Sequence, residues 1–120
     1  MSTDPTPEAL RARYHDRLHA ELADLLRASS DTAESRRPVE LDQQSVGRLS
    51  RMDAMQGQAM AAAGESRRQA RISGTRAALD RLQGAEFGYC AQCGEFIGLP
   101  RLDLDPRVQR CIACAGGGRR

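Results

Sequence analysis

Four cysteines carry the clearest chemistry in this sequence, and all of them fall in its last third. They form two Cys-x-x-Cys pairs, Cys90 with Cys93 and Cys111 with Cys114, and 17 residues separate the pairs. This spacing is typical of a site in which four thiolates hold one Zn²⁺ in a tetrahedron. Because four thiolates leave no position for water, the spacing predicts one structural zinc ion and not a catalytic one.

Two disulfides, or an iron–sulfur or redox-switch centre, would use the same four cysteines. The N-terminus lacks the basic-then-apolar pattern of a secretory signal, and the sequence has no run of about 18 apolar residues. We therefore expect a cytoplasmic protein without a membrane segment. Thiols stay reduced in that compartment, which favours the zinc site over disulfides.

The composition provides little material for a globular core. Leu, Ile, Val and Phe together number 20 of 120 residues, and there is no Trp, which approaches the composition of chains that do not fold alone. The bound metal is therefore expected to contribute folding free energy. The 18 basic residues are all Arg and face 16 acidic ones, for a net charge of +2. A nucleic-acid coat protein would show a much larger basic surplus.

Apolar side chains spaced by three and four residues predict a first helix from Pro7 to about Ala28. They are Leu10, Tyr14, Leu18, Leu22, Leu25 and Leu26. A polar run that begins at Ser29 predicts a turn, which we place near residues 29–44.

A second helix is predicted from about Leu41 to Gln83, with Asp42 as the capping residue of its first turn. Its predicted seam consists of Val46, Leu49, Met52, Ala59, Ala63, Ala70, Ile72, Leu79 and Leu82. The group Met52, Met55 and Met60 is expected to pack in this seam and not to form a partner surface. Three glycines weaken the helix prediction, and a break near Gly74 stays open. Two such helices joined by a polar turn form an antiparallel hairpin, or coiled coil.

Charge differs between the two predicted helices. Residues 1–45 carry six Arg and nine acids, for a net charge of −3, whereas residues 46–83 carry seven Arg and three acids, for a net charge of +4. The basic group Arg67, Arg68 and Arg71 is therefore expected to pair with acids of the first helix. His15 and His19 stand four residues apart, but no third ligand is near in the sequence, so a solvated helix face is expected there.

Residues 84–115 alternate glycines with aromatic and aliphatic residues, which predicts loops and metal-binding knuckles. Gly94 follows the first cysteine pair, where a knuckle needs a positive φ. A short last helix is expected after Asp105 and Pro106, carrying Cys111 and Cys114 near its end. The predicted fold class is mainly α: a helical hairpin over 1–83, a small four-cysteine zinc lobe over 84–115 and a flexible tail over 116–120.

The C-terminal residues resemble the zinc finger of the DksA/TraR family. The matching residues are Leu79, Leu82, Phe87, Gly88, Tyr89, Cys90, Cys93, Gly94, Ile97, Arg101, Leu102, Pro106, Cys111, Ile112 and Cys114. The resemblance implies a transcription regulator that binds bacterial RNA polymerase, and not promoter DNA, by inserting a coiled coil into the secondary channel. It also implies acidic residues at the coiled-coil tip and guanosine tetraphosphate as a candidate co-effector.

The family's tip pattern, Asp-x-x-Asp-x-Ala, does not occur in this sequence. Our first candidate for the tip residue is Asp42, followed by Glu40 and then Asp53; helix capping is the alternative role for Asp42. Asp105 and Ala115 stand where alarmone-using members carry basic residues, which argues against alarmone dependence. No catalytic constellation appears in the sequence, so a monomeric, non-enzymatic regulator is expected. The alternative is a zinc-ribbon module that binds nucleic acid or serves as a protein adaptor.

Overall fold

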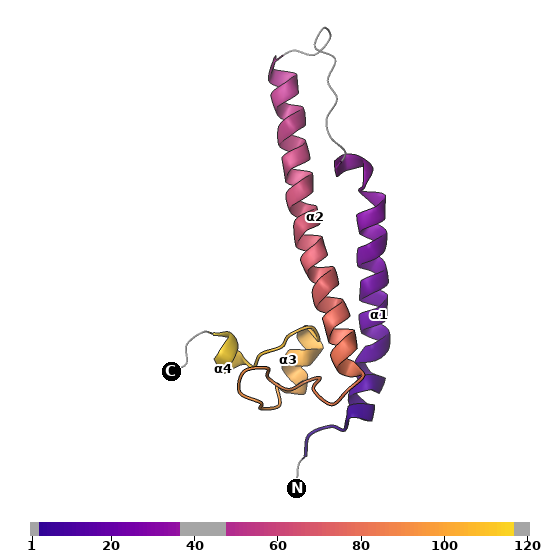
Figure 1. The fold of residues 1–120 in the computed structure, drawn as a ribbon, viewed down its shortest axis with the longest axis vertical. Helices are drawn as coiled ribbons and strands as arrows, with labels where there is room; N and C mark the ends of the chain where they lie inside the picture. The colour runs from indigo at the N-terminus through magenta and orange to yellow at the C-terminus, as the bar shows by residue number, and fades with distance from the viewer. Residues whose placement is uncertain (1–2, 37–47, 117–120) are drawn as a thin grey trace. The chain divides into compact units, whose positions relative to one another are not determined.

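The computed structural model describes residues 3–36 and 48–116. Helix α1 spans Pro7–Asp31, and a single 3-10 turn, η1, spans Glu34–Arg36. Helix α2 spans Arg48–Leu82, and two short helices follow, α3 over Leu99–Leu104 and α4 over Ile112–Ala115. The described residues contain no β-strand, only an isolated antiparallel bridge between Tyr89 and Phe96. The mainly helical fold class is thereby confirmed (Figure 1).

The first predicted helix is confirmed and is longer than expected. Helix α1 continues through Ser29 and Asp31, so the turn begins later than the polar run predicted. The Thr32 hydroxyl donates to the carbonyl oxygen of Ala28, 2.9 Å away, which satisfies one acceptor at the end of the helix. Residues 37–44 of the predicted turn lie outside the described residues.

The second predicted helix is confirmed over Arg48–Leu82 as one continuous helix. The α-helix passes through Gly57, Gly64 and Gly74 without interruption, so the break near Gly74 does not occur. Its predicted first turn, with the cap at Asp42, lies outside the described residues.

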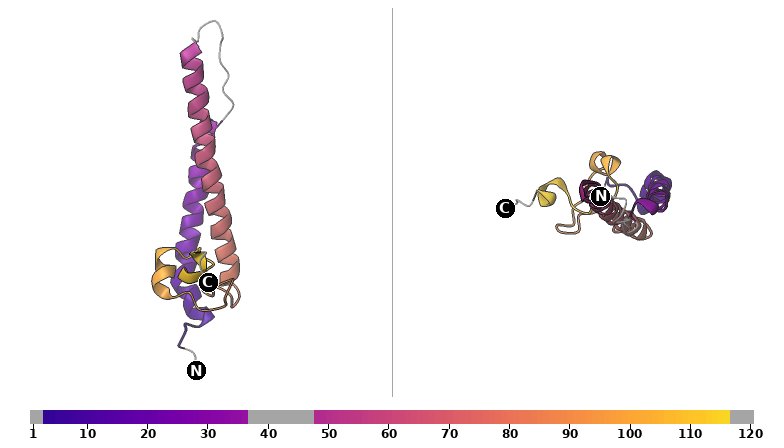
Figure 2. Two further views of the ribbon diagram at one scale, coloured as in Figure 1. Left: turned by 90° about the vertical axis from the view of Figure 1, so that its left-hand side faces the viewer. Right: turned by 90° about the horizontal axis from the view of Figure 1, so that it is seen from above.

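The chain packs as two compact units. The finger unit combines Met1–Leu22 with Ser73–Arg120, and the hairpin unit is Ala23–Ile72. Within each unit a part of α1 lies beside an antiparallel part of α2 (Figures 1 and 2). The domain boundary predicted between residues 83 and 84 stays a prediction. In the structure, the predicted zinc lobe packs in one unit with the start of α1 and the end of α2.

The hydrophobic core lies in the finger unit and draws on α1, α2, α3 and the segment between α2 and α3. The core side chains are Leu10, Tyr14 and Leu18 of α1, Ala78 and Leu82 of α2, Phe87, and Leu102 of α3. The Tyr14 and Phe87 rings lie 5.5 Å apart, centroid to centroid. Gly88 has φ +89°, and a Cβ there would lie 3.0 Å from Phe96 Cε1, so a larger residue would disturb this packing.

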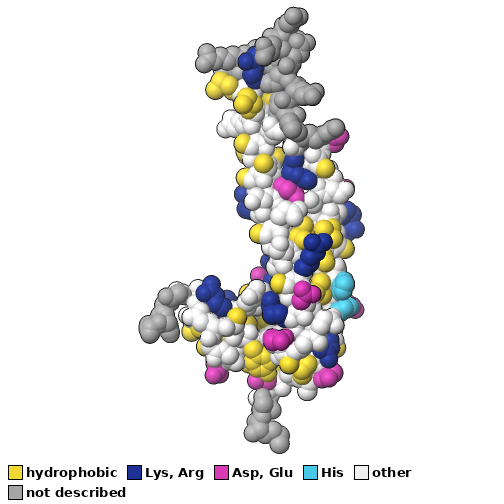
Figure 3. Space-filling view, viewed as in Figure 1, with side chains coloured by type: hydrophobic (Ala, Val, Ile, Leu, Met, Phe, Trp, Pro, Cys, Tyr) yellow, Lys and Arg dark blue, Asp and Glu magenta, His cyan; other side chains and the backbone are white. Residues whose placement is uncertain are grey.

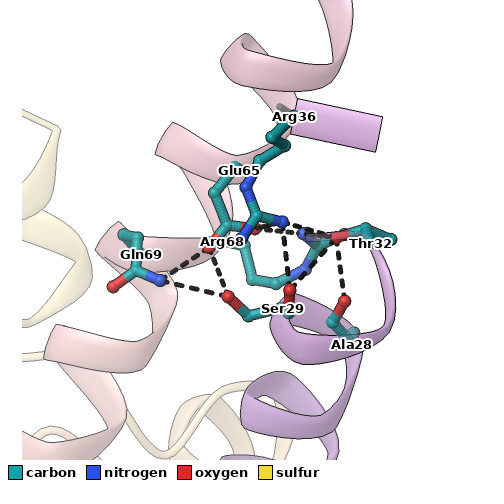
Figure 4. A network of polar contacts seen from close by, with 7 residues as sticks. All are labelled: Ala28, Ser29, Thr32, Arg36, Glu65, Arg68 and Gln69. Carbon is teal, nitrogen blue, oxygen red and sulfur yellow. Dashed lines mark hydrogen bonds and ion pairs between the residues drawn. The ribbon is translucent and has the colours of Figure 1, made fainter. Parts of the chain in front are cut away.

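The hairpin unit is held together differently, by a polar network around Glu65 of α2 (Figure 4). The Ser29 hydroxyl donates to Glu65 Oε2 at 2.5 Å, and Arg36 Nη1 lies 3.1 Å from Glu65 Oε1. Gln69 and Arg68 also donate to this carboxylate. Hydrogen bonds from Ser29, Gln69 and Arg68 together lower the pKa of Glu65 to about 2, against a smaller effect of burial. The carboxylate therefore stays charged at neutral pH and joins the end of α1 to α2.

Candidate metal centre

The first cysteine pair sits in a tight knuckle. The Gly94 amide donates to the Cys90 carbonyl oxygen at 2.9 Å, and Gly94 has φ +81°, which confirms the conformation expected of that glycine. The amides of Gln92 and Cys93 both point at Cys90 Sγ, 3.4 Å away. Amides directed at a sulfur stabilise its thiolate, which is the form that binds a metal.

The second pair sits at the start of α4. Cys111 is the N-cap of this four-residue helix, and Cys114 lies within it. The predicted short last helix is present, but it begins at Ile112 and not after Asp105 and Pro106, because Asp105 instead ends α3. The Asp105 amide donates to the carbonyl oxygen of Arg101, and its carboxylate accepts from the amide and side chain of Arg107.

The four sulfurs converge, all within 4.8 Å of one another. Cys93 Sγ and Cys111 Sγ are 3.7 Å apart, close to the ~3.8 Å that separates two sulfurs in a tetrahedron with Zn–S bonds of ~2.3 Å. Cys90 is 4% exposed and Cys93 is open to solvent. A donor set of four sulfurs fits Zn²⁺ and leaves no ligand position for water.

The electrostatics around the sulfurs favour thiolates at one member of each pair. Burial opposes the charge on Cys90, but hydrogen bonds from the amides of Cys93, Cys111 and Gln92 outweigh it and lower the pKa of Cys90 to about 6. A hydrogen bond from the Cys114 amide lowers the pKa of Cys111. Each pair thus offers a sulfur that ionises readily and can bind the metal first.

Helix α3 lies in the segment predicted to form loops, and it contacts α1. Arg13 Nε donates to Asp103 Oδ1 at 3.0 Å, and the Tyr14 hydroxyl donates to the same oxygen at 2.8 Å. Arg17 Nη1 donates to the Asp103 carbonyl oxygen at 2.5 Å. The hydrogen bond from Arg13 is the largest of the causes that lower the pKa of Asp103 to about 2. In the sequence, only Gly98 followed by Leu99 and Pro100 indicates a helix start here.

Of the three candidate tip residues, only Asp53 is among the described residues, and it is not part of the cysteine site. Asp42 and Glu40 lie outside the described residues, and Asp53 is exposed on α2 in the hairpin unit. The structure therefore leaves their proposed role as a prediction.

Two further expectations can be compared with the structure. Met52, Met55 and Met60 do not pack in a seam but are 56%, 57% and 68% exposed, so that expectation is wrong. Arg68 pairs with Glu65 of its own helix, not with an acid of the first helix. The ion pair that reaches α2 is Arg36 with Glu65. The base comes from the segment after α1 and the acid comes from α2, which is the reverse of the expected pairing.

The histidine pair lies at the surface of α1 (Figure 3). The His15 and His19 rings are 4.4 Å apart, centroid to centroid, and His15 Nδ1 lies 3.1 Å from the Asp16 carboxylate. Among the described His, Cys, Asp and Glu residues, only the four cysteines gather three or more potential ligands. In the same part of the chain, no helix is both long and apolar enough to cross a membrane.

The fold and the site together define an α-helical protein with a four-cysteine zinc finger. Residues 85–117 match the family described as the prokaryotic dksA/traR C4-type zinc finger. This segment is thus similar to the DksA/TraR zinc finger, and the match together with the four clustered cysteines supports a structural zinc ion.

Similar proteins agree with this assignment. The RNA polymerase-binding transcription factor DksA of Haemophilus influenzae is 47% identical over 38 residues, which cover 32% of this chain and 26% of the relative. The protein of the same description from Escherichia coli is 42% identical over 36 residues, 30% of this chain and 24% of the relative. The matched segment thus spans about a quarter of the curated relatives.

A solved structure resembles the chain over a longer stretch. Transcription factor DksA2 from Pseudomonas aeruginosa superposes with a TM-score of 0.59 at 22% identity, covering 90% of this chain and 76% of the other. At this identity the likeness shows a shared fold.

Proposed function

We propose that this protein is a transcription regulator that binds bacterial RNA polymerase. The observation that carries the proposal is the finger: residues 85–117 match the DksA/TraR model, and relatives matched over this segment are described as RNA polymerase-binding transcription factors. These relatives are described as transcription factors, which supports a regulator over an enzyme as the proposed function.

The proposed mode of action is entry of the hairpin unit into the secondary channel of the polymerase, where its tip modulates initiation without sequence-specific DNA binding. The tip carboxylate is Asp42 in this proposal, with Glu40 and Asp53 as the second and third candidates. A long α2 and an α1 joined to it through Glu65 support the proposal, because a charged tip acts at a distance only if its helices hold it in place.

Guanosine tetraphosphate is not needed in the proposed mechanism. Asp105 stands at one of the two positions where alarmone-using members carry a basic residue, and its carboxylate already accepts hydrogen bonds from Arg107. The other position holds Ala115, which has no charge to offer a phosphate.

The test is co-purification of the zinc-loaded chain with core polymerase in the absence of DNA, followed by crosslinking from position 42. We expect a stable complex and crosslinks to the walls of the secondary channel. Crosslinking from position 24, which lies exposed on α1 of the same unit, is the matched control. Failure to bind core polymerase at any tested salt concentration would overturn the proposal.

A second candidate, a zinc ribbon that binds nucleic acid, has one observation in its favour. Arg101, Arg107 and Arg110 line an open hollow beside the cysteines. However, a zinc ion with four thiolates carries a net charge of −2, which offsets this basic lining. Nucleic-acid binding that falls steeply with salt, together with no binding to polymerase, would favour this candidate.

A further inference from the structure

Helix α2 carries two repeats of alternating three- and four-residue spacing, on two of its faces. The first repeat is buried or half-buried: Ala54, Gln58, Ala61, Glu65, Arg68 and Ile72. It lies toward α1, as the hydrogen bond between Ser29 and Glu65 shows. The second repeat is exposed at every position: Met52, Gln56, Ala59, Ala63, Ser66 and Ala70. Side chains at this spacing share one face of a helix, so α2 has one face packed toward α1 and one open face.

Large apolar side chains lie exposed on or beside this open face of α2. Met52, Met55 and Met60 are each more than half exposed, whereas Ile72 is the one hydrophobic residue that is buried among the described residues of this unit. Figure 3 shows hydrophobic side chains at the surface along α2. Clustered exposed methionines are typical of surfaces that bind another protein.

One acidic and one basic residue stand at the edge of this face, placed so that an antiparallel copy of the helix would bring opposite charges together. Asp53, Met60 and Arg67 follow one another at intervals of seven residues, and all three are exposed. Residue 60 is the midpoint between the other two. A second α2 lying antiparallel, centred near this midpoint, would therefore place its Arg67 opposite Asp53 and its Asp53 opposite Arg67.

We propose that the exposed repeat of α2 binds the same repeat of a second copy of this chain in an antiparallel pair. Ala59 packs against the partner's Ala63 at the centre, and Met52 packs against the partner's Ala70 at each end. Each outer layer thus pairs a large side chain with a small one, which lets the helices approach closely. Two ion pairs, each between Asp53 and the partner's Arg67, fix the register and the antiparallel direction.

The pair is expected to be weak and reversible. The contact runs along about 18 helical residues, or ~27 Å, and buries less area than the ~1,600 Å² of a standard stable interface. We therefore expect a dissociation constant between about 10 µM and 1 mM. This pairing is independent of the proposed function. In place of the expected monomer, we expect an equilibrium between monomer and pair that depends on protein concentration. While paired, this face of the hairpin unit is closed to any other partner.

The experiment is sedimentation equilibrium of the zinc-loaded full chain from about 5 µM to 1 mM at low salt. Asp53→Arg alone and Arg67→Asp alone each place like charges together and should raise the dissociation constant at least about tenfold. The double variant restores opposite charges and should return within about threefold of the wild type. Asp80→Arg, an equal charge change at an exposed position of the same helix, is the matched control and should have no such effect.

Met60→Glu is a second variant that leaves Asp53 and Arg67 unchanged. It places two carboxylates face to face at the midpoint of the pair and should therefore dissociate it. Helix content by circular dichroism and zinc content should not change, since Met60 is 68% exposed. A wild type that remains monomeric at about 1 mM overturns the inference. It is also overturned if the double charge variant is no tighter than either single variant, or if Met60→Glu leaves the dissociation constant of the pair unchanged.

Discussion

Leu102 and Leu104 of α3 offer a matched test of how the finger packs on the ends of α1 and α2. Leu102 is fully buried in the core, whereas Leu104, two residues later, is 83% exposed. Replacing Leu102 by Ala removes three carbon groups, at ~0.8 kcal/mol each, and leaves a cavity that adds to the loss. The expected decrease in the free energy of unfolding is about 2 to 5 kcal/mol for Leu102→Ala, against less than about 0.5 kcal/mol for Leu104→Ala.

The assay is thermal unfolding of the zinc-loaded protein, followed by circular dichroism. Since a loss of 1 kcal/mol lowers Tm by roughly 4 °C or more in a chain of this size, Leu102→Ala should melt at least about 8 °C below the wild type. Leu104→Ala should melt within about 2 °C of the wild type. Two variants with equal Tm values would refute the packing of α3 in the finger unit.

The remaining predictions concern the metal, the tip, the polar network and the alarmone. Cys114→Ser should lower zinc affinity and loosen the finger while α1 and α2 keep much of their helicity, as elemental analysis and circular dichroism would show; a folded, reduced wild type without zinc would contradict this. Asp42→Asn, which keeps the helix-capping ability, should abolish the effect on transcription and leave polymerase binding nearly intact; activity lost only in Asp53→Asn would place the tip there instead. Because the folded pKa of Glu65 is lowered to about 2, its charge stabilises the fold above its ordinary pKa near 4.5. That stabilisation is lost as the pH falls toward 2, so the Tm difference between wild type and Glu65→Gln should shrink over this window. Guanosine tetraphosphate should change transcription by the protein less than about twofold in a defined assay; a larger dependence would show that another site supplies the missing charge.

The cysteine site could be predicted because its geometry is encoded in short spacings. Two residues between the cysteines of each pair fix a tight turn, and Gly94 supplies the positive φ the first turn requires. The first helix could be predicted for a similar reason, since Leu10, Tyr14 and Leu18 recur at helical intervals and are all buried.

Helix α3 was missed because its stability comes from other parts of the chain. Six residues are too few for a helix to be stable alone, and Gly98 and Pro100 are ordinary loop residues in a sequence pattern. The contacts that hold α3 come from Arg13, Tyr14 and Arg17, which lie more than eighty positions earlier.

The seam of α2 was only partly predictable, because alanine occurs on more than one of its faces. Ala59 and Ala63 were assigned to the seam, yet they are exposed, while Ala54 and Ala61 are half-buried. Spacing shows that a seam exists but not which of two parallel repeats faces α1. In this unit, contacts of Glu65 with Ser29 and Arg36 mark the packed face, and such polar contacts are not visible in a hydrophobic pattern.

The connectivity of the finger unit makes the hairpin unit an insertion between two halves of one folded body. Its core is closed by residues on either side of the 50-residue segment Ala23–Ile72. Adding one heptad to each helix would lengthen this segment by 14 residues and raise the entropic cost of closing the core by only ~0.2 kcal/mol. Natural selection could therefore adjust the reach of the hairpin in paired heptads, at almost no cost to the metal-bearing body that anchors it.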